Sequence, residues 1–156
     1  MNEKFRTKKV STPQEMTMCR RIRERVFCEE QNISKEAEFD GFDNVSDHFL
    51  CFKDNVAIGT GRLRKIDSEE YKIERMAVTK TERLKGVGKL IMDAIVKDWA
   101  KKRNSENLIL HSQVQVTPFY EQLGFKSVGN NFFEEGINHI KMVFDLEHFR
   151  ENKDKQ

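Results

Sequence analysis

Two segments of the chain carry apolar residues at helical spacing. Residues 86–102 hold the clearest apolar stripe, with intervals of three and four that predict a core-facing helix. The members of this stripe are Val87, Leu90, Ile91, Ala94, Ile95 and Trp99. A second amphipathic helix is predicted from Pro13, which follows two capping residues and stands where a first-turn proline belongs, to about Glu30. These two helices are the longest that the pattern predicts.

Short apolar runs around these helices predict β-strands. The predicted strands cover residues 5–10, 48–53, 56–66, 71–79, 108–112 and 140–146. Asp54-Asn55 suits a tight hairpin turn, and Thr117-Pro118 opens a brief helix that ends at Gly124. Residues 31–47 lack sustained periodicity and predict a long loop with room for a helical turn. The order of elements predicts an α/β (α+β) fold, a mixed sheet with helices on both faces.

Length and charge narrow the classes of function. A chain of 156 residues suits one domain, so we expect a single domain over residues 1–150 and a charged tail over residues 151–156. The 28 basic and 26 acidic residues give a net charge of +2, too balanced for a general nucleic-acid or membrane binder. No stretch approaches the roughly 20 apolar residues that span a bilayer. Any anion site must therefore be local.

The cysteines and histidines show no metal-binding pattern. Cys19, Cys28 and Cys51 form no CxxC pair, so we expect reduced and mostly buried thiols. The four histidines are scattered without the i, i+4 spacing of a helical metal site. The sequence therefore predicts a cytoplasmic protein without a bound metal.

The segment that joins a predicted strand to the clearest helix suits an anion. Residues 83–88, Arg-Leu-Lys-Gly-Val-Gly, lead into the start of that helix, whose first backbone N–H groups lack intrahelical acceptors. The two glycines let an anion approach the backbone without a Cβ in the way. Arg83, Lys85 and Lys89 add positive charge. The alternative is an ordinary turn with solvated basic residues, but the strand and helix on either side favour a phosphate or pyrophosphate site.

Two motifs together resemble the GNAT superfamily of N-acetyltransferases. Arg83, Gly86 and Gly88 fill the [Q/R]xxGx[G/A] signature for acetyl-CoA, and residues 119–125, FYEQLGF, are similar to the FYxxxGF element near the end of that fold. A second set of residues resembles the ElaA/YjcF-like branch: residues 25–27 and 30–31 of the first helix, Glu38, Asp40 and Asp43 of the acidic stretch that follows, and His111, Gln113 and residues 136–139 later in the chain. The resemblance covers nearly the whole chain. It implies a GNAT-like mixed, mostly antiparallel sheet with a splayed central strand pair.

The resemblance implies an acyltransferase in which an amine attacks the thioester of acetyl-CoA directly. It implies acetyl-CoA contacts at Met76, Ala77, Val78, Arg83, Leu84, Lys85, Gly86, Val87, Gly88, Lys89, Gln113 and Phe119. The main rival function is a catalytically inactive CoA-binding sensor or interaction module. An RNA-binding domain that uses the basic segment 80–103 is a third, although aromatic platforms are not evident there. The amine acceptor and the oligomeric state stay open, although many relatives pair as homodimers.

Two residues are candidates for the catalytic chemistry. Tyr120 matches the position where many relatives place a tyrosine that donates a proton or hydrogen bond to the leaving CoA thiolate, and the alternative is a core aromatic. Glu74 is a candidate general base, because period-two alternation would put it on the face shared with Met76 and Val78. The alternative for Glu74 is a surface carboxylate that pairs with arginines 62 or 64 across the strands.

Four further residues are weaker candidates for contacts with a cationic amine. Glu38 and Asp40 lie in the acidic stretch, and His111 and His139 follow later in the chain. For most of the acidic residues the alternative, a solvated loop face, is favoured over a substrate pocket.

Overall fold

The computed structural model describes residues 4–102 and 106–147, which fall into two compact units. The first unit draws on Met1–Lys65 and Ile73–Asn104, and the second on Ile66–Lys72 and Ser105–Gln156. The predicted tail, residues 151–156, lies outside the described residues.

The strands of the first unit follow the chain order. They are β1 (Phe5–Lys9), β2 (Asp47–Lys53), β3 (Val56–Lys65) and the greater part of β4 (Glu70–Val78), in the order β1-β2-β3-β4. Strands β1 and β2 pair antiparallel, as do β2 and β3. Asp54, at the turn between β2 and β3, has φ +53°, a conformation that Asp tolerates better than most residues. The hairpin predicted at Asp54-Asn55 is therefore confirmed.

The helices of the first unit agree with the sequence pattern, except that the last part of the predicted first helix is a π-helix. They are α1 (Pro13–Arg23), a π-helix (Glu24–Glu30), α2 (Lys35–Glu38), short 3-10 turns (Asp43–Val45 and Lys80–Glu82) and α3 (Val87–Lys102). Thr12 caps α1, because its hydroxyl accepts from Glu15 N at 3.1 Å while the Glu15 carboxylate accepts from Thr12 N. A hydrogen bond from Lys8 lowers the pKa of Glu15 to about 2. The capping carboxylate is therefore ionised at neutral pH.

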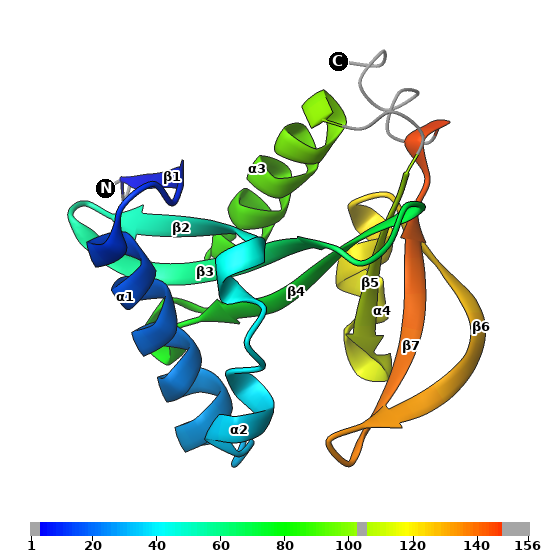
Figure 1. Ribbon diagram of the computed structural model, residues 1–156, viewed down its shortest axis with the longest axis horizontal. Helices are drawn as coiled ribbons and strands as arrows, with labels where there is room; N and C mark the ends of the chain where they lie inside the picture. Colours follow the sequence, from blue (N-terminus) through cyan, green and yellow to red (C-terminus); the bar gives the residue numbers. More distant parts are fainter. Residues whose placement is uncertain (1–3, 103–105, 148–156) are drawn as a thin grey trace. The chain divides into compact units, whose positions relative to one another are not determined.

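Helices α1 and α3 cover opposite faces of these strands (Figure 1). Cys19 and Ile22 of α1 pack with Leu50 of β2 in a buried cluster on one face. On the other face α3 lies directly on β3, because a Cβ at Gly59 would stand only 2.8 Å from the Cδ1 of Ile91. This close approach fixes the N-terminal turn of α3 against the sheet.

The second unit contains three antiparallel strands and a short helix. Its elements are β5 (Asn107–Gln113), a 3-10 turn (Val114–Val116), α4 (Thr117–Gln122), β6 (Phe125–Glu134) and β7 (Ile137–Phe144), and the strand order is β5-β7-β6. The first residues of β4 belong to this unit, where Glu69 O accepts a hydrogen bond from Asn107 N at 2.7 Å.

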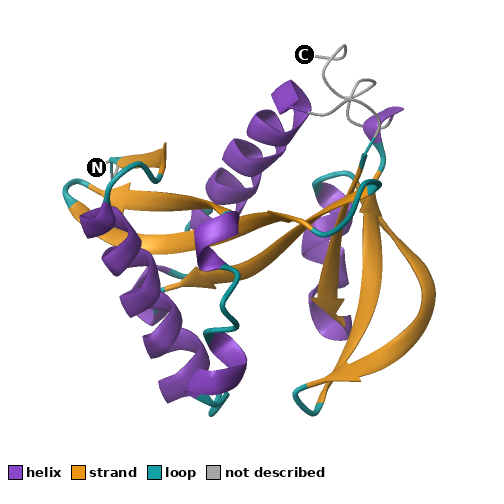
Figure 2. Cartoon of the chain, in the orientation of Figure 1, coloured by secondary structure: helices purple, strands orange, loops and turns teal. Residues whose placement is uncertain are grey.

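The sequence pattern does not predict strand β6. After the short helix it predicts one strand, at 140–146, where the structure has two. The register of β6 against β7 shifts between Val128 and Phe132, and Gly129 has φ +76°. This bulge interrupts the alternation of side chains and bends the strand, whose curvature is visible in Figure 2. The prediction failed because a polar Gly-Asn-Asn segment lies inside the strand instead of ending it.

The described residues also bear on thiols, metals and membranes. Cys19 and Cys51 are buried, Cys28 is partly buried, and all three are free thiols, as predicted. Within residues 4–102 and 106–147, no group of three or more His, Cys, Asp or Glu side chains is placed to hold a metal ion. No helix in these same ranges is long and apolar enough to cross a bilayer.

Candidate functional site

The turn before α3 is exposed and has the backbone of an anion site. Gly86 has φ +86°, and a Cβ at this position would meet no atom within 4 Å. A backbone hydrogen bond runs from Leu90 N to Gly86 O at 3.1 Å, across the first turn of the helix. The N–H groups of Val87, Gly88 and Lys89 lie N-terminal to Leu90 and stand at the positive end of the helix dipole. This geometry suits the predicted phosphate site.

Two basic residues of this turn are paired with carboxylates. Arg83 donates through Nε to Val78 O at 2.9 Å, and its Nη2 lies 2.8 Å from a carboxylate oxygen of Glu30. The Nζ of Lys85 lies 3.4 Å from an oxygen of Glu82. These contacts fasten the turn to the end of β4 and balance part of its charge. Arg83 therefore holds the turn in place, in addition to any contact with a ligand.

The predicted acetyl-CoA residues differ in how much of the side chain a ligand can reach. Ala77 and Val87 are 4% and 2% exposed and pack in the core, so their side chains are not available to a ligand. Leu84 is fully exposed. In the second unit, Gln113 Oε1 accepts a hydrogen bond from the side chain of Gln115 at 3.0 Å.

A backbone irregularity in β4 separates Glu74 from Met76. Arg75 has φ +58°, which breaks the period-two alternation of the strand. Met76 lies on the α3 face, where its Sδ would stand 2.6 Å from a Cβ at Gly61. Glu74 instead contacts arginines of β3 that share the α1 face. The prediction that Glu74 shares a face with Met76 is therefore wrong. The catalytic role of Glu74 stays a prediction.

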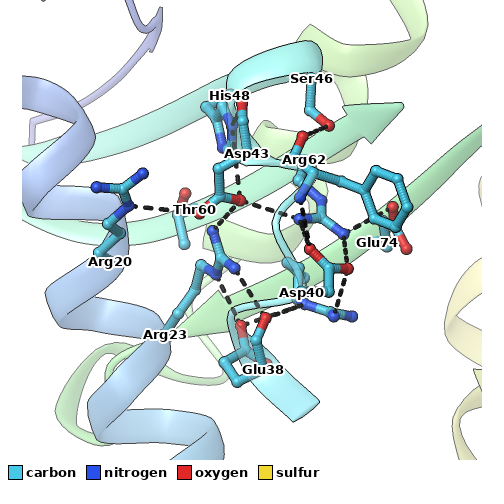
Figure 3. Close-up of polar contacts among 12 residues, drawn as sticks. Arg20, Arg23, Glu38, Asp40, Asp43, Ser46, His48, Thr60, Arg62 and Glu74 are labelled. Carbon is cyan, nitrogen blue, oxygen red and sulfur yellow. Dashed lines mark hydrogen bonds and ion pairs between the residues drawn. The ribbon is translucent and has the colours of Figure 1, made fainter. Parts of the chain in front are cut away.

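Glu74 belongs to an ion network around Arg62, whose side chain is 0% exposed (Figure 3). The two terminal nitrogens of Arg62 donate to both carboxylate oxygens of Asp40, at 3.0 and 2.8 Å. They also donate to Asp43 Oδ1 and Glu74 Oε1, each at 2.9 Å. Arg64 is a second partner of Glu74. The alternative pairing of Glu74 with Arg62 or Arg64 is confirmed, but Glu74 is buried, with 7% of its side chain exposed.

A second buried arginine extends this network to α1 and α2. Arg23, 1% exposed, donates to Glu38 Oε2 at 2.7 Å and to Asp43 Oδ1 at 2.8 Å. Arg75 reaches Glu38 and Asp40 from β4, with its Nε 3.3 Å from Glu38 Oε2 and its Nη2 3.0 Å from Asp40 Oδ2. We call the full set the buried ion network; its members are Arg23, Arg62, Arg64, Arg75, Glu38, Asp40, Asp43 and Glu74.

The network sets the protonation of its carboxyl groups. Burial opposes ionisation of Asp40, but the hydrogen bonds from Arg62 outweigh it and hold the pKa of Asp40 well below its usual range. At Glu38 burial dominates and raises the pKa, although Arg23 opposes this. Burial also lowers the pKa of His48, whose Nε2 donates to Asp43 O at 2.9 Å. The carboxylates of Glu38, Asp40 and Asp43 therefore face the network and not solvent, whereas Glu36 is exposed as a solvated loop residue.

This burial bears on the weaker substrate candidates Glu38 and Asp40. Both oxygens of Asp40 accept hydrogen bonds from arginines, and Glu38 is 3% exposed. A cationic amine would have to displace an arginine to pair with either group. Their role in substrate binding stays a prediction.

Tyr120 lies on α4 in the second unit, where its ring packs among aromatic side chains. Its ring packs edge to face against Phe119 and Phe125, with centroids 5.0 and 6.2 Å apart. Burial raises the pKa of Tyr120 to about 12, so the phenol keeps its proton at neutral pH. Across the described residues, its hydroxyl has no hydrogen-bond partner. The ring is a packing element, and the role of the hydroxyl as a donor to the leaving thiolate stays a prediction.

His111 and His139 come together in the second unit, around a residue that the sequence analysis missed. The Nδ1 of His111 lies 2.6 Å from Glu134 Oε1, and the Nε2 of His139 lies 4.0 Å from Glu134 Oε2. Phe132 packs against both rings, edge to face with His111 and stacked with His139. The hydrogen bond from His111 lowers the pKa of Glu134. Because Glu134 lies in the unpredicted strand β6, no periodicity signal pointed to it.

Comparison with known proteins assigns the family. A family model described as an acetyltransferase (GNAT) domain matches residues 8–146. The chain belongs to the GNAT acetyltransferase family. YjcF of Bacillus subtilis, an uncharacterized N-acetyltransferase, is 37% identical over 125 residues, which are 80% of this chain and 88% of YjcF. The uncharacterized protein YyaT of the same organism is 34% identical over 142 residues, 89% of this chain and 95% of YyaT. The predicted resemblance is confirmed, and the chain is a GNAT-type acyltransferase.

Solved structures confirm the GNAT fold. Escherichia coli ElaA superposes with a TM-score of 0.82 at 23% identity, over 91% of this chain and 100% of ElaA. An acyl-CoA N-acyltransferase from Pseudomonas aeruginosa gives 0.80 at 23%, over 92% and 100%. A GNAT family acetyltransferase from Elizabethkingia anophelis with acetyl-CoA bound gives 0.63 at 18%, over 89% and 94%. The predicted mixed, mostly antiparallel α/β fold is therefore correct, while the single-domain boundaries and the splayed strand pair stay predictions.

Proposed function

We propose that this GNAT domain transfers an acetyl group from acetyl-CoA to the nitrogen of an amine. The observation that carries the proposal is the exposed turn at residues 83–89, whose glycine backbone and helix N-terminus suit a pyrophosphate within a chain of this family. The Elizabethkingia relative, which has acetyl-CoA bound, supports acetyl-CoA as the donor. Three free thiols suit a reducing compartment, so we also propose a cytoplasmic location.

In this proposal the chain's residues divide the work of binding and bond breaking. The backbone of Met76, Ala77 and Val78 would pair with the pantetheine arm as an added strand does, and a backbone N–H there would polarise the acetyl carbonyl. Residues 83–89 would hold the pyrophosphate. Tyr120 would donate a hydrogen bond to the sulfur as the carbon–sulfur bond breaks, since its phenol is protonated at neutral pH.

A screen for thiol release tests this function. Purified protein would be incubated with acetyl-CoA and, separately, butylamine, spermidine, glucosamine and a lysine-containing peptide, with free CoA thiol measured over time. We expect release above the amine-free rate for at least one of these classes, and an acetylated amine of matching amount by mass spectrometry. Acetyl-CoA binding without turnover across the panel would support the rival function, a CoA-binding sensor or interaction module.

A further inference from the structure

One face of the second unit's sheet gathers polar side chains from three strands. Gln113 of β5 lies opposite His139 of β7, and His139 lies opposite Phe132 of β6. Because side chains two residues apart share a face, His111 and Glu134 lie on this same face. The opposite face carries Phe125 and Phe144, which line up with Tyr120 of α4. The histidines therefore stand on the sheet face that α4 leaves uncovered.

The hydrogen bond between His111 and Glu134 determines which ring nitrogen is basic. A carboxylate only accepts hydrogen bonds, so the Nδ1 of His111 carries the proton in the 2.6 Å contact. The neutral ring then has its lone pair on Nε2, which has no hydrogen-bond partner within the described residues. The side chain of His111 is 24% exposed, so its ring is partly open to solvent.

The second histidine is held differently. The Nδ1 of His139 lies 2.7 Å from Ile137 O, a carbonyl that likewise only accepts. Its basic nitrogen, Nε2, is turned toward Glu134 at 4.0 Å, and its side chain is 12% exposed. His139 therefore donates to the backbone and makes no hydrogen bond to Glu134, because two acceptors face each other at 4.0 Å, whereas His111 donates to Glu134 directly.

Other charged groups on this face leave the pair intact. Lys141 lies opposite His111 on β7, but its Nζ pairs with Glu70 at 2.8 Å. Lys72 adds positive charge near Glu134 and, with His111 and His139, favours the ionised carboxylate. An ionised Glu134 accepts the Nδ1 proton of His111 and so fixes the tautomer and the orientation of its ring.

We propose that His111 is the general base that takes a proton from the acceptor amine, and that Glu134 is the positioning residue that orients its ring. This rests on the function proposed above. An alkyl ammonium with a pKa near 10.4 is only about one-thousandth neutral at cellular pH, so the reaction needs a base. Glu74 is a weaker choice, because its carboxylate is 7% exposed and already accepts hydrogen bonds from Arg62 and Arg64.

The proton balance of the step is complete. The ammonium gives one proton to His111 Nε2, which passes it to solvent. The freed nitrogen lone pair forms the bond to the acetyl carbon, and the carbon–sulfur bond breaks with its electron pair on sulfur. The second nitrogen proton that is lost goes to the thiolate, which leaves as CoA thiol. The products are the acetamide, CoA and one proton in solution.

The test compares His111→Gln and Glu134→Gln with Glu135→Gln, a matched control at the exposed neighbouring carboxylate. With the fastest alkylamine of the panel at pH 7.5, we expect His111→Gln to lower kcat/KM roughly 10²- to 10³-fold. The deficit should shrink below about 10-fold near pH 10, where the amine supplies its own free base. The KM for acetyl-CoA and the activity of Glu135→Gln should not change.

Glu134→Gln should lower kcat/KM roughly 10-fold while the KM for acetyl-CoA stays unchanged, because an amide can donate as well as accept and no longer fixes the tautomer of the His111 ring. Carboxyl NMR on His111→Gln should show the pKa of Glu134 rising toward its ordinary value. An active wild type with an equally active His111→Gln, or with a deficit that is constant across pH, would overturn the base assignment alone. A wild type that acetylates none of the amines would overturn the proposed function as well.

Discussion

Replacing Arg62 with methionine is expected to lower the free energy of unfolding by about 3–5 kcal/mol, as for other broken buried ion pairs. The side chain of Arg62 is fully buried and donates to Asp40, Asp43 and Glu74. Methionine fills a similar volume but leaves these carboxylates with one guanidinium fewer in a poorly solvated site. Urea or thermal denaturation at pH 7 measures the loss.

Arg20→Met is the matched control, because Arg20 contacts the same Asp43 from the surface. Its side chain is 48% exposed and its Nε lies 3.4 Å from Asp43 Oδ2, so we expect a loss below about 1 kcal/mol. The lowered pKa of Asp40 contributes stability that is present above about pH 3.8 and is lost as the pH falls through the lowered value. The gap between wild type and Arg62→Met should therefore narrow in acid. If Arg62→Met lowers the free energy of unfolding by no more than the small loss expected for Arg20→Met, the network contributes little to stability.

Tyr120→Phe is expected to lower kcat about 10²-fold while acetyl-CoA affinity stays within about twofold. The substitution keeps the ring that packs on Phe119 and Phe125 and removes only the hydroxyl. A hydroxyl that acts as the thiolate leaves contributes to the transition state more than to binding. Initial rates with saturating amine, together with a direct binding measurement, separate the two effects.

The chain offers a chemically matched control for this variant. Tyr71→Phe removes the other tyrosine hydroxyl, which lies in β4, and should keep full activity. If Tyr120→Phe also keeps full activity, Tyr120 is a packing residue and another group protonates the thiolate.

Elements with an uninterrupted periodic pattern could be predicted from the sequence. Helix α3 begins and ends within a residue of its prediction, since six apolar residues define one face. The turn before it could be located because glycines and basic residues directly precede that face. Local sequence determines these features, so a local pattern finds them.

Features that depend on distant partners or on backbone irregularity could not be predicted. Arg75 adopts a left-handed conformation without a glycine to signal it, so Glu74 was assigned to the wrong face. The acidic residues of 31–47 resemble a solvated loop until Arg23 and Arg62, from two other elements, are placed beside them. Glu134 was missed with its strand, because the bulge after Val128 resembles a turn in the sequence.

Isothermal titration of the purified chain with acetyl-CoA tests the central claim, that residues 83–89 hold the pyrophosphate of this donor. We predict saturable binding to one site per chain that weakens as salt concentration rises, and loss of that binding in a folded Gly88→Glu variant, which places a carboxylate at the helix N-terminus. No detectable heat at millimolar acetyl-CoA, or full affinity in Gly88→Glu, would contradict the account.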